Sequence, residues 1–217
     1  MCARLVDVIY ASLRRLGWLF FRVWCRLEVT GLEHLPRRGG LLLASNHLSF
    51  IDPPVLMAAC PRRLTFLAKA NLYRFRSLAL LLRASGSVPV GRRGGLDLGL
   101  REAIRRLRQG RAVVIFPEGG RQFTGRLGHA RPGAGMVAFR ARVPVVPVLI
   151  RGTYQALSPR DWIIWPRKIQ VAFSPPIDYP VRSSPEDEYL TLAKQITATW
   201  RAVEETLACP HKPKKLS

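Results

Sequence analysis

Short apolar runs alternate with longer amphipathic segments through most of this chain. An apolar run of about four to eight residues between glycine, proline or polar residues is typical of a buried strand, and apolar residues recurring every three or four positions are typical of a helix. Strands that alternate with helices indicate an α/β domain with a mixed, partly parallel sheet flanked by helices. We expect strands at 41–44, 64–68, 87–90, 112–116, 145–150 and 168–173, and helices at 53–60, 72–83, 96–108, 132–142 and 185–207.

The strand expected at 145–150 contains one proline, and another proline directly precedes it. The segment Val143-Pro144-Val145-Val146-Pro147-Val148 is apolar throughout, which suits a buried strand. Proline has no backbone N–H and cannot donate a hydrogen bond to a neighbouring strand. We therefore expect this strand at an edge of the sheet or at a bulge.

The first 27 residues form an amphipathic pattern of their own. Leu5 to Leu27 is strongly apolar, but charged residues interrupt it, and no uncharged run is longer than that from Leu16 to Phe21. A spanning helix needs about 20 consecutive apolar residues and is therefore disfavoured. In a helical projection the charged residues occupy roughly one third of the circumference, opposite a wide apolar face. The charged set is Arg4, Asp7, Arg14, Arg15, Arg22 and Arg26, and the apolar set is Leu5, Ile9, Leu13, Leu16, Phe20, Val23, Trp24 and Leu27.

This pattern is typical of a helix that lies in the membrane interface, with arginines towards the headgroups and aromatic residues at the acyl boundary. A helix packed on the protein's own core is one alternative. A signal peptide is another, but no small-residue cleavage site follows, and Arg22 and Arg26 interrupt the apolar stretch. We therefore expect three parts: a membrane-interfacial helical arm at 1–27, one α/β domain at 28–209 and a loose basic tail at 210–217.

The charge of the chain is strongly positive, with 35 Lys and Arg against 14 Asp and Glu and a formal net charge of +21. Such an excess indicates an anionic partner, such as nucleic acid, an anionic bilayer, or a phosphorylated or CoA-like substrate. The basic residues are spread along the chain without an RNA- or DNA-binding signature, so nucleic acid is not expected. The four cysteines form no Cys-x-x-Cys pair, which disfavours a disulfide framework or a zinc site and favours a reducing compartment.

A histidine and an aspartate follow the strand expected at 41–44. In the segment from Asn46 to Pro53, His47 and Asp52 are five positions apart, so they do not share a helical face but can meet across a turn. Pro53 suits the first turn of a helix, which would make Asp52 the N-cap, with its carboxylate free to turn back to His47. Because α/β sheets place ligands at carboxyl strand ends, the two residues are candidates for a catalytic pair. A capping Asp beside a structural His would give the same pattern.

Two further segments place charged residues at strand ends. Phe116-Pro117-Glu118-Gly119-Gly120-Arg121 follows the most apolar expected strand, and its two glycines let the backbone approach a ligand closely. An ordinary turn with a surface ion pair would read in the same way. Val88-Pro89-Val90-Gly91-Arg92-Arg93 ends in two arginines, which suit forked contacts with phosphate.

Together these segments resemble the boxes of the glycerolipid acyltransferase family, which includes the 1-acylglycerol-3-phosphate acyltransferases. Residues 46–52 resemble its NHxxxxD box and residues 116–121 its FPEGTR box. Residues 86–92 resemble the block between them and residues 143–148 the valine-proline block, and the resemblance covers about residues 28–175. The departures are Gly120 for the usual Thr, Gln122 for the common Ser, and Arg131-Pro132-Gly133 for the usual Lys-Pro-Gly.

The resemblance implies roles for particular residues. His47 would take the proton from the acceptor hydroxyl as that hydroxyl attacks an acyl thioester, and Asp52 would hold the imidazole and stabilise its cation. Ser49 is a conceivable acyl-enzyme nucleophile, but its position in the family's box carries no covalent intermediate. The residues implied at the substrate are Arg92 and Arg121, which would bind the acceptor's phosphate, and Glu118, Gly119 and Gly120, which would shape the loop around it.

The expected function is acyl transfer from acyl-CoA or acyl carrier protein to a lysophospholipid, with 1-acylglycerol-3-phosphate giving phosphatidic acid. The site of action would be an anionic membrane surface on the cytoplasmic face. Because the sequence has no metal-ligand cluster or nucleotide loop, we expect no metal and no cofactor beyond the acyl donor. Alternatives are another acceptor, either glycerol phosphate or a lyso-aminolipid, and a non-catalytic basic protein that binds membranes or nucleic acid.

Overall fold

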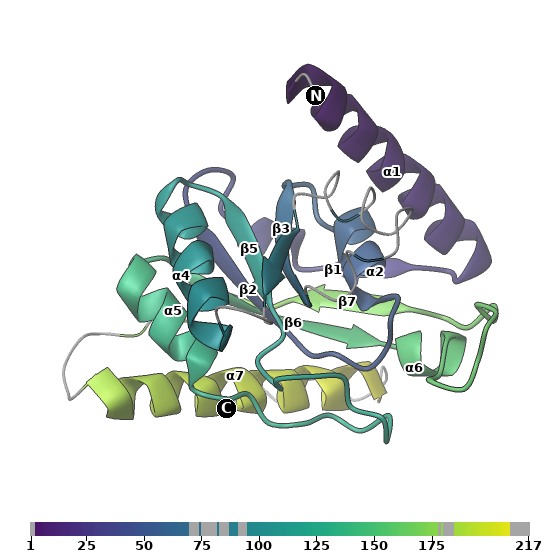
Figure 1. Ribbon diagram of the computed structural model, residues 1–217. Helices are drawn as coiled ribbons and strands as arrows, with labels where there is room; N and C mark the ends of the chain where they lie inside the picture. The colour runs from purple at the N-terminus through teal and green to yellow at the C-terminus, as the bar shows by residue number, and fades with distance from the viewer. Residues whose placement is uncertain are drawn as a thin grey trace.

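The computed structural model describes residues 3–69, 74, 82, 87–90, 95–177, 179 and 185–208 (Figure 1). Within these residues, seven strands form one sheet in the order β1-β7-β6-β2-β5-β3-β4. All neighbouring strands are parallel except β6 and β7, so the predicted mixed, partly parallel sheet is confirmed. The strands are β1 (Glu28–Thr30), β2 (Leu41–Ser45), β3 (Leu64–Lys69), β4 (Val88–Val90), β5 (Ala112–Ile115), β6 (Val145–Arg151) and β7 (Gln170–Phe173).

Helices cover both faces of this sheet. On one face, α1 (Ala3–Trp24) and α2 (Asp52–Ala59) enclose a core cluster that includes Leu41, Val114 and Val148. On the other face, α4 (Gly95–Arg108), α5 (Gly133–Ala141) and α7 (Pro185–Ala208) enclose a second cluster around the fully buried Trp200. Figure 1 shows the two groups of helices on opposite sides of the strands. The short elements η1 (Leu32–His34) and α6 (Thr153–Ala156) lie in connections.

The strand that contains Pro147 was predicted at an edge of the sheet or at a bulge, and the edge position is wrong. Strand β6 lies inside the sheet, between β7 and β2. Pro147 is tolerated there because only its carbonyl is needed, and that oxygen accepts a hydrogen bond of 2.9 Å from the backbone N–H of Ser174, just past the end of β7. Pro144 likewise contributes its carbonyl, which accepts from Leu42 N at 3.1 Å.

The apolar side of α1 is divided between the core and solvent. Tyr10 and Phe21 are buried against the sheet-side cluster, and Gly17 lets the helix approach Ala58 of α2. The predicted helix is therefore present, and part of its apolar surface packs on the protein itself. Among the described residues, no helix combines the length and apolarity needed to cross a bilayer. Seven apolar side chains of α1 are exposed: Val8, Leu16, Trp18, Leu19, Phe20, Val23 and Trp24.

Three elements had no counterpart in the sequence pattern. Strand β1, η1 and α6 contain only three, three and four residues, too few for a period of apolar residues to be visible. The helix expected at 72–83 and the tail at 210–217 lie outside the described residues, apart from single positions of the former. The division of the chain at residue 27 stays a prediction.

Candidate active site

The candidate site lies where β2 and β5 end side by side. These strands are parallel, with Leu43 paired to Val114 and Ala44 to Ile115, so their carboxyl ends meet at one edge of the sheet. The chain that leaves β2 carries His47 and Asp52, and the chain that leaves β5 carries Glu118. The sheet topology therefore brings the two predicted boxes together, as expected for a ligand site of an α/β fold.

The Asp52 carboxylate organises the turn that follows β2. This side chain is fully buried, and its Oδ2 atom accepts three hydrogen bonds: from His47 Nδ1 at 2.8 Å, Leu48 N at 2.7 Å and Ser49 N at 2.8 Å. Asp52 is the first residue of α2 and Ile51 is the N-cap, so the prediction that Asp52 caps the helix is wrong. The expected turn of its carboxylate back to His47 is confirmed, and all three donors precede the helix.

This contact fixes the proton arrangement of the His47 ring. An ionised carboxylate can only accept hydrogen bonds, so Nδ1 carries the ring proton and donates a hydrogen bond to Asp52. Nε2 of the neutral ring is then an acceptor. The imidazole also stacks on Phe116, with ring centroids 4.1 Å apart and planes inclined by 22°. The side chain stays 17% exposed. The ring is therefore held in one orientation, with Nε2 suited to take a proton from a substrate.

Glu118 holds the backbone of His47 from the neighbouring strand end. Its Oε2 accepts a hydrogen bond from His47 N, and its Oε1 accepts one from Gly128 N, both at 2.9 Å. The carbonyl of His47 accepts a further bond of 2.9 Å from Gln122 N. Burial is the main cause that raises the pKa of Glu118, to about 7; the two N–H donors oppose this rise and the nearby Asp52 adds to it. Glu118 thus positions His47 rather than lying open to solvent.

Asn46 and Ser49 connect the turn to other parts of the fold. Asn46 donates from Nδ2 to Ile150 O at 2.9 Å and accepts from Ile150 N at 2.7 Å, which joins the end of β2 to β6. Ser49 is buried, and its hydroxyl donates to Leu157 O at 2.7 Å. The Ser49 hydroxyl thus already donates its hydrogen bond to a backbone carbonyl, which argues against Ser49 as the nucleophile.

Arg121 lies over two exposed aromatic rings. Its guanidinium carbon is 3.3 Å from the ring centroid of Phe50 and 5.1 Å from that of Phe123. Burial is the main cause that lowers the pKa of Arg121, and the Asp52 carboxylate opposes it. Stacking uses the flat face of a guanidinium and leaves its N–H edge available for a phosphate or carboxylate.

The two glycines of the second box differ in their surroundings. Gly119 has φ +80°, and a Cβ built there would lie 2.9 Å from the guanidinium carbon of Arg131. A Cβ at Gly120 would meet nothing within 4 Å. Gly119 is therefore required by the backbone, whereas the space beside Gly120 can hold a larger residue such as the threonine of the family pattern.

The predicted site residues are thus brought together in part. His47, Asp52, Glu118, Gly119, Gly120 and Arg121 lie at one sheet edge, while Arg92 is outside the described residues. Sequence reasoning assigned no role to Phe116, which stacks on the catalytic candidate, or to Gly128, which donates to Glu118. The position of Phe116 beside the box was visible, but its contact with His47 depends on the pairing of β2 with β5.

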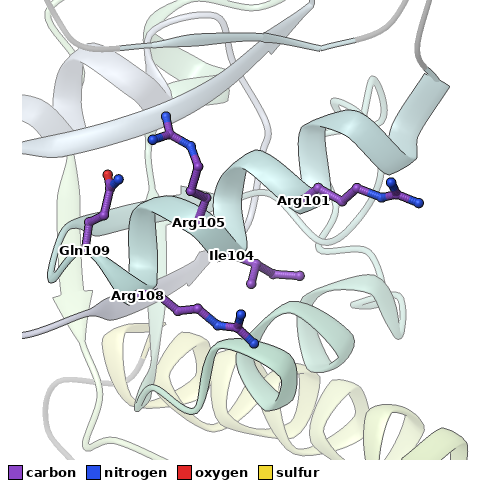
Figure 2. Close-up of a pocket in the computed structure, with 5 residues that line it drawn as sticks. All are labelled: Arg101, Ile104, Arg105, Arg108 and Gln109. Atoms are coloured by element: carbon purple, nitrogen blue, oxygen red, sulfur yellow. The ribbon is translucent and has the colours of Figure 1, made fainter.

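A separate hollow lies on α4 and contains none of the predicted site residues. It is lined by three arginines, an isoleucine and a glutamine (Figure 2). Arg105 also pairs with Glu102 on the same helix at 2.6 Å, so part of its charge is already balanced. The lining residues are Arg101, Ile104, Arg105, Arg108 and Gln109.

Known proteins share both this sequence and this fold. The profile of the acyltransferase family matches residues 26–151, so the chain belongs to the acyltransferase family and is an acyl-transferring enzyme. The crystal structure of the 1-acyl-sn-glycerophosphate (LPA) acyltransferase PlsC from Thermotoga maritima superposes with a TM-score of 0.79 and 28% identity, covering 99% of this chain and 86% of that one.

Curated relatives carry related names. A probable 1-acyl-sn-glycerol-3-phosphate acyltransferase from Mycoplasma pneumoniae is 28% identical over 93% of this chain and 79% of its own length. The chloroplastic 1-acyl-sn-glycerol-3-phosphate acyltransferase LPAT1 from Arabidopsis thaliana is 33% identical over 59% of this chain. That match spans only 36% of the Arabidopsis protein, and a match to a Brassica napus relative spans 38%.

We expect alanine to be harmful at Gly119 and harmless at Gly120. Gly119→Ala places a side chain at φ +80° and displaces the Arg131 guanidinium, so the free energy of unfolding should fall by about 1–3 kcal/mol. Gly120→Ala is the matched control and should stay within about 0.5 kcal/mol of wild type. Urea unfolding of the three proteins measures this, and equal losses at both positions would contradict it.

The buried Glu118 should make stability depend on pH. Because folding raises its pKa from 4.5 to about 7, the folded state binds the proton more tightly than the unfolded state. Its stabilising effect is therefore complete below about 4.5 and is lost as the pH rises through about 7. Glu118→Gln cannot titrate, so the stability of wild type relative to this variant should fall across that interval. Urea unfolding of both proteins from pH 4 to about 8 checks this, and a constant difference would contradict it.

Proposed function

We propose that this enzyme transfers a fatty acyl chain from an acyl thioester to the free hydroxyl of a lysophospholipid, with 1-acylglycerol-3-phosphate as the acceptor and phosphatidic acid as the product. The observation that carries this proposal is the bond between His47 Nδ1 and the buried Asp52, which leaves Nε2 as a base at the sheet edge. The names of the relatives support the choice of acceptor.

The reaction follows from the orientation of the imidazole. His47 Nε2 removes the proton of the acceptor hydroxyl while its oxygen attacks the thioester carbonyl carbon. The tetrahedral intermediate then breaks its C–S bond, and the leaving thiolate takes the proton back from the imidazolium. Asp52 stabilises that cation and holds the ring, as the carboxylate does in a catalytic triad. No covalent intermediate on the enzyme is needed, which agrees with the position of Ser49.

Arg121 is the described residue that suits the phosphate of the acceptor. The guanidinium carbon lies over the rings of Phe50 and Phe123, and the N–H groups of a guanidinium can form two parallel hydrogen bonds with one phosphate. We propose Arg92 as a second phosphate ligand on the basis of its sequence box. A phosphate-free lyso-aminolipid would make no such contacts, and the stacked Arg121 therefore favours a phosphorylated acceptor over that alternative.

The acceptor's acyl chain makes a membrane surface the natural place of action. We propose that α1 lies in the interface of an anionic bilayer on the cytoplasmic side, with its exposed apolar side chains in the acyl boundary. The positive charge of the chain supports this by attracting anionic lipids. The donor is acyl-CoA or acyl carrier protein, and the proposed chemistry needs neither a metal nor a further cofactor.

Removing the catalytic base should stop acyl transfer. We expect His47→Ala to lower the rate constant by about 10²–10⁴-fold, and Asp52→Asn to lower it strongly because the imidazole loses its orienting charge. His34→Ala is the matched control, since the His34 ring is hydrogen-bonded to the Phe173 carbonyl and lies in η1, outside both predicted boxes. Product formation from 1-acylglycerol-3-phosphate is measured with acyl-CoA and with acyl carrier protein as donors. Near wild-type turnover in His47→Ala would refute the proposal.

Replacing the Arg121 fork should weaken acceptor binding. Arg121→Lys keeps the positive charge but loses the planar pair of donors, so KM for the acceptor should rise about tenfold, with a smaller change in kcat. Arg126→Lys, in the same loop and exposed, should leave KM unchanged. An unchanged KM in Arg121→Lys would assign the phosphate to another basic residue.

A further inference from the structure

The connection between α6 and β7 projects large apolar side chains into solvent. We call residues 157–168 the tryptophan loop. Trp162 is 98% exposed, Ile163 is 66% exposed and Trp165 is 52% exposed. Burying any of them in an apolar phase would be favourable, so their exposure needs an explanation by a partner rather than by folding.

The backbone of the tryptophan loop is held in place from within. Trp165 N donates to Ala156 O at 2.7 Å, and Ser158 N donates to the Asp161 carboxylate at 2.9 Å. Ile164 turns inward and packs against the core cluster beneath α1 and α2. The backbone that carries the exposed side chains is therefore held by hydrogen bonds and packing, while the side chains themselves remain in solvent.

Hydrogen bonds join the tryptophan loop to the end of α1. The indole N–H of Trp24 donates to Ile164 O at 2.8 Å, and Ile169 N donates to Cys25 O at 3.0 Å. Figure 1 shows the connection after α6 next to the carboxyl end of α1. The exposed apolar side chains Val23 and Trp24 of α1 thus adjoin those of the loop.

The other end of the tryptophan loop touches the candidate active site. Leu157 O accepts the hydroxyl proton of Ser49, which lies in the turn that holds His47. Tyr154 in α6 donates from its hydroxyl to Phe123 O at 3.1 Å, next to the aromatic rings around Arg121. One continuous stretch therefore links the site, the loop and α1.

The chemistry of the loop suits a lipid surface better than a protein surface. Tryptophan is enriched at membrane interfaces because its ring is apolar and its N–H is polar. Exposed Arg160 and Arg167 flank the apolar tip, as expected for contact with anionic headgroups. The 98% exposure of Trp162 marks a projecting tip, which can enter the acyl boundary of a bilayer without a matching pocket.

We propose that the tryptophan loop is a second lipid-binding element, which inserts Trp162 and Ile163 into an anionic bilayer beside α1. Two attachment points fix the tilt of the enzyme, so the sheet edge with His47 and Arg121 faces the lipid that carries the acceptor. The inference rests on the proposed membrane-bound acceptor, and it assigns the contact to residues that take no part in the chemistry.

Vesicle flotation with the full chain tests this inference. We expect Trp162→Asp and Ile163→Asp each to lower the partition coefficient on mixed phosphatidylcholine–phosphatidylglycerol vesicles about tenfold or more. Leu98→Asp is the matched control, because Leu98 is 58% exposed on α4, across the sheet, and should bind as wild type does. Leu19→Asp, 55% exposed on α1, tests the other attachment point separately.

The outcomes separate this inference from the proposed function. Turnover of a short-chain, water-soluble acceptor should be unchanged in the two loop variants, and activity on vesicle-held acceptor should fall with their binding. If Leu19→Asp lowers vesicle binding and both loop variants bind as wild type does, the loop inference is overturned while the membrane role of α1 stands. It is also overturned if the loop variants change only the oligomeric state in light scattering, because the loop would then be a protein contact. If the wild-type protein does not acylate the soluble acceptor at all, that result counts against the proposed function and not against the loop inference.

Discussion

The site depends on one buried carboxylate oxygen. Asp52 Oδ2 accepts two backbone N–H groups and the His47 ring, so a single atom both closes the turn after β2 and orients the base. Burying an ionised carboxylate is costly unless donors surround it, and these three donors replace water at Oδ2, while the buried Oδ1 has no hydrogen-bond partner among the described residues. The backbone of the turn and the geometry of the His47–Asp52 pair therefore cannot vary independently.

Glu118 provides the complementary constraint from the next strand. It binds the main chain of His47, whereas Asp52 binds the side chain, and Phe116 covers one face of the ring. The two carboxylates have different environments: Asp52 shares one oxygen among three donors, and Glu118 uses one oxygen for each of two. Two acidic residues can thus serve one histidine in different ways, one in the proposed proton transfer and the other in fixing its position.

The sequence was sufficient for contacts formed within a short segment. His47 and Asp52 are five residues apart, and the turn between them is implied by Pro53, which follows them. The bond between His47 N and Glu118 joins residues 71 positions apart and exists because β2 pairs with β5, which no local pattern specifies. The edge prediction for the strand with Pro147 was wrong for a related reason. Whether a sheet tolerates a proline depends on whether a neighbouring strand needs its missing N–H, and the local sequence does not show which strand is that neighbour.

The placement of apolar residues on α1 shows how one helix can meet two requirements. Its buried side, with Tyr10 and Phe21, belongs to the core that supports β2, so α1 is part of the fold that holds the site. Its other apolar side is exposed, and Trp24 on that side is hydrogen-bonded to the tryptophan loop. The first residue of this loop, Leu157, accepts a hydrogen bond from the Ser49 hydroxyl. A rigid connection therefore runs from the exposed apolar surface to the turn around Asp52. Because that connection consists of packed side chains and hydrogen bonds, any surface that binds α1 and the loop together also fixes the direction in which His47 faces.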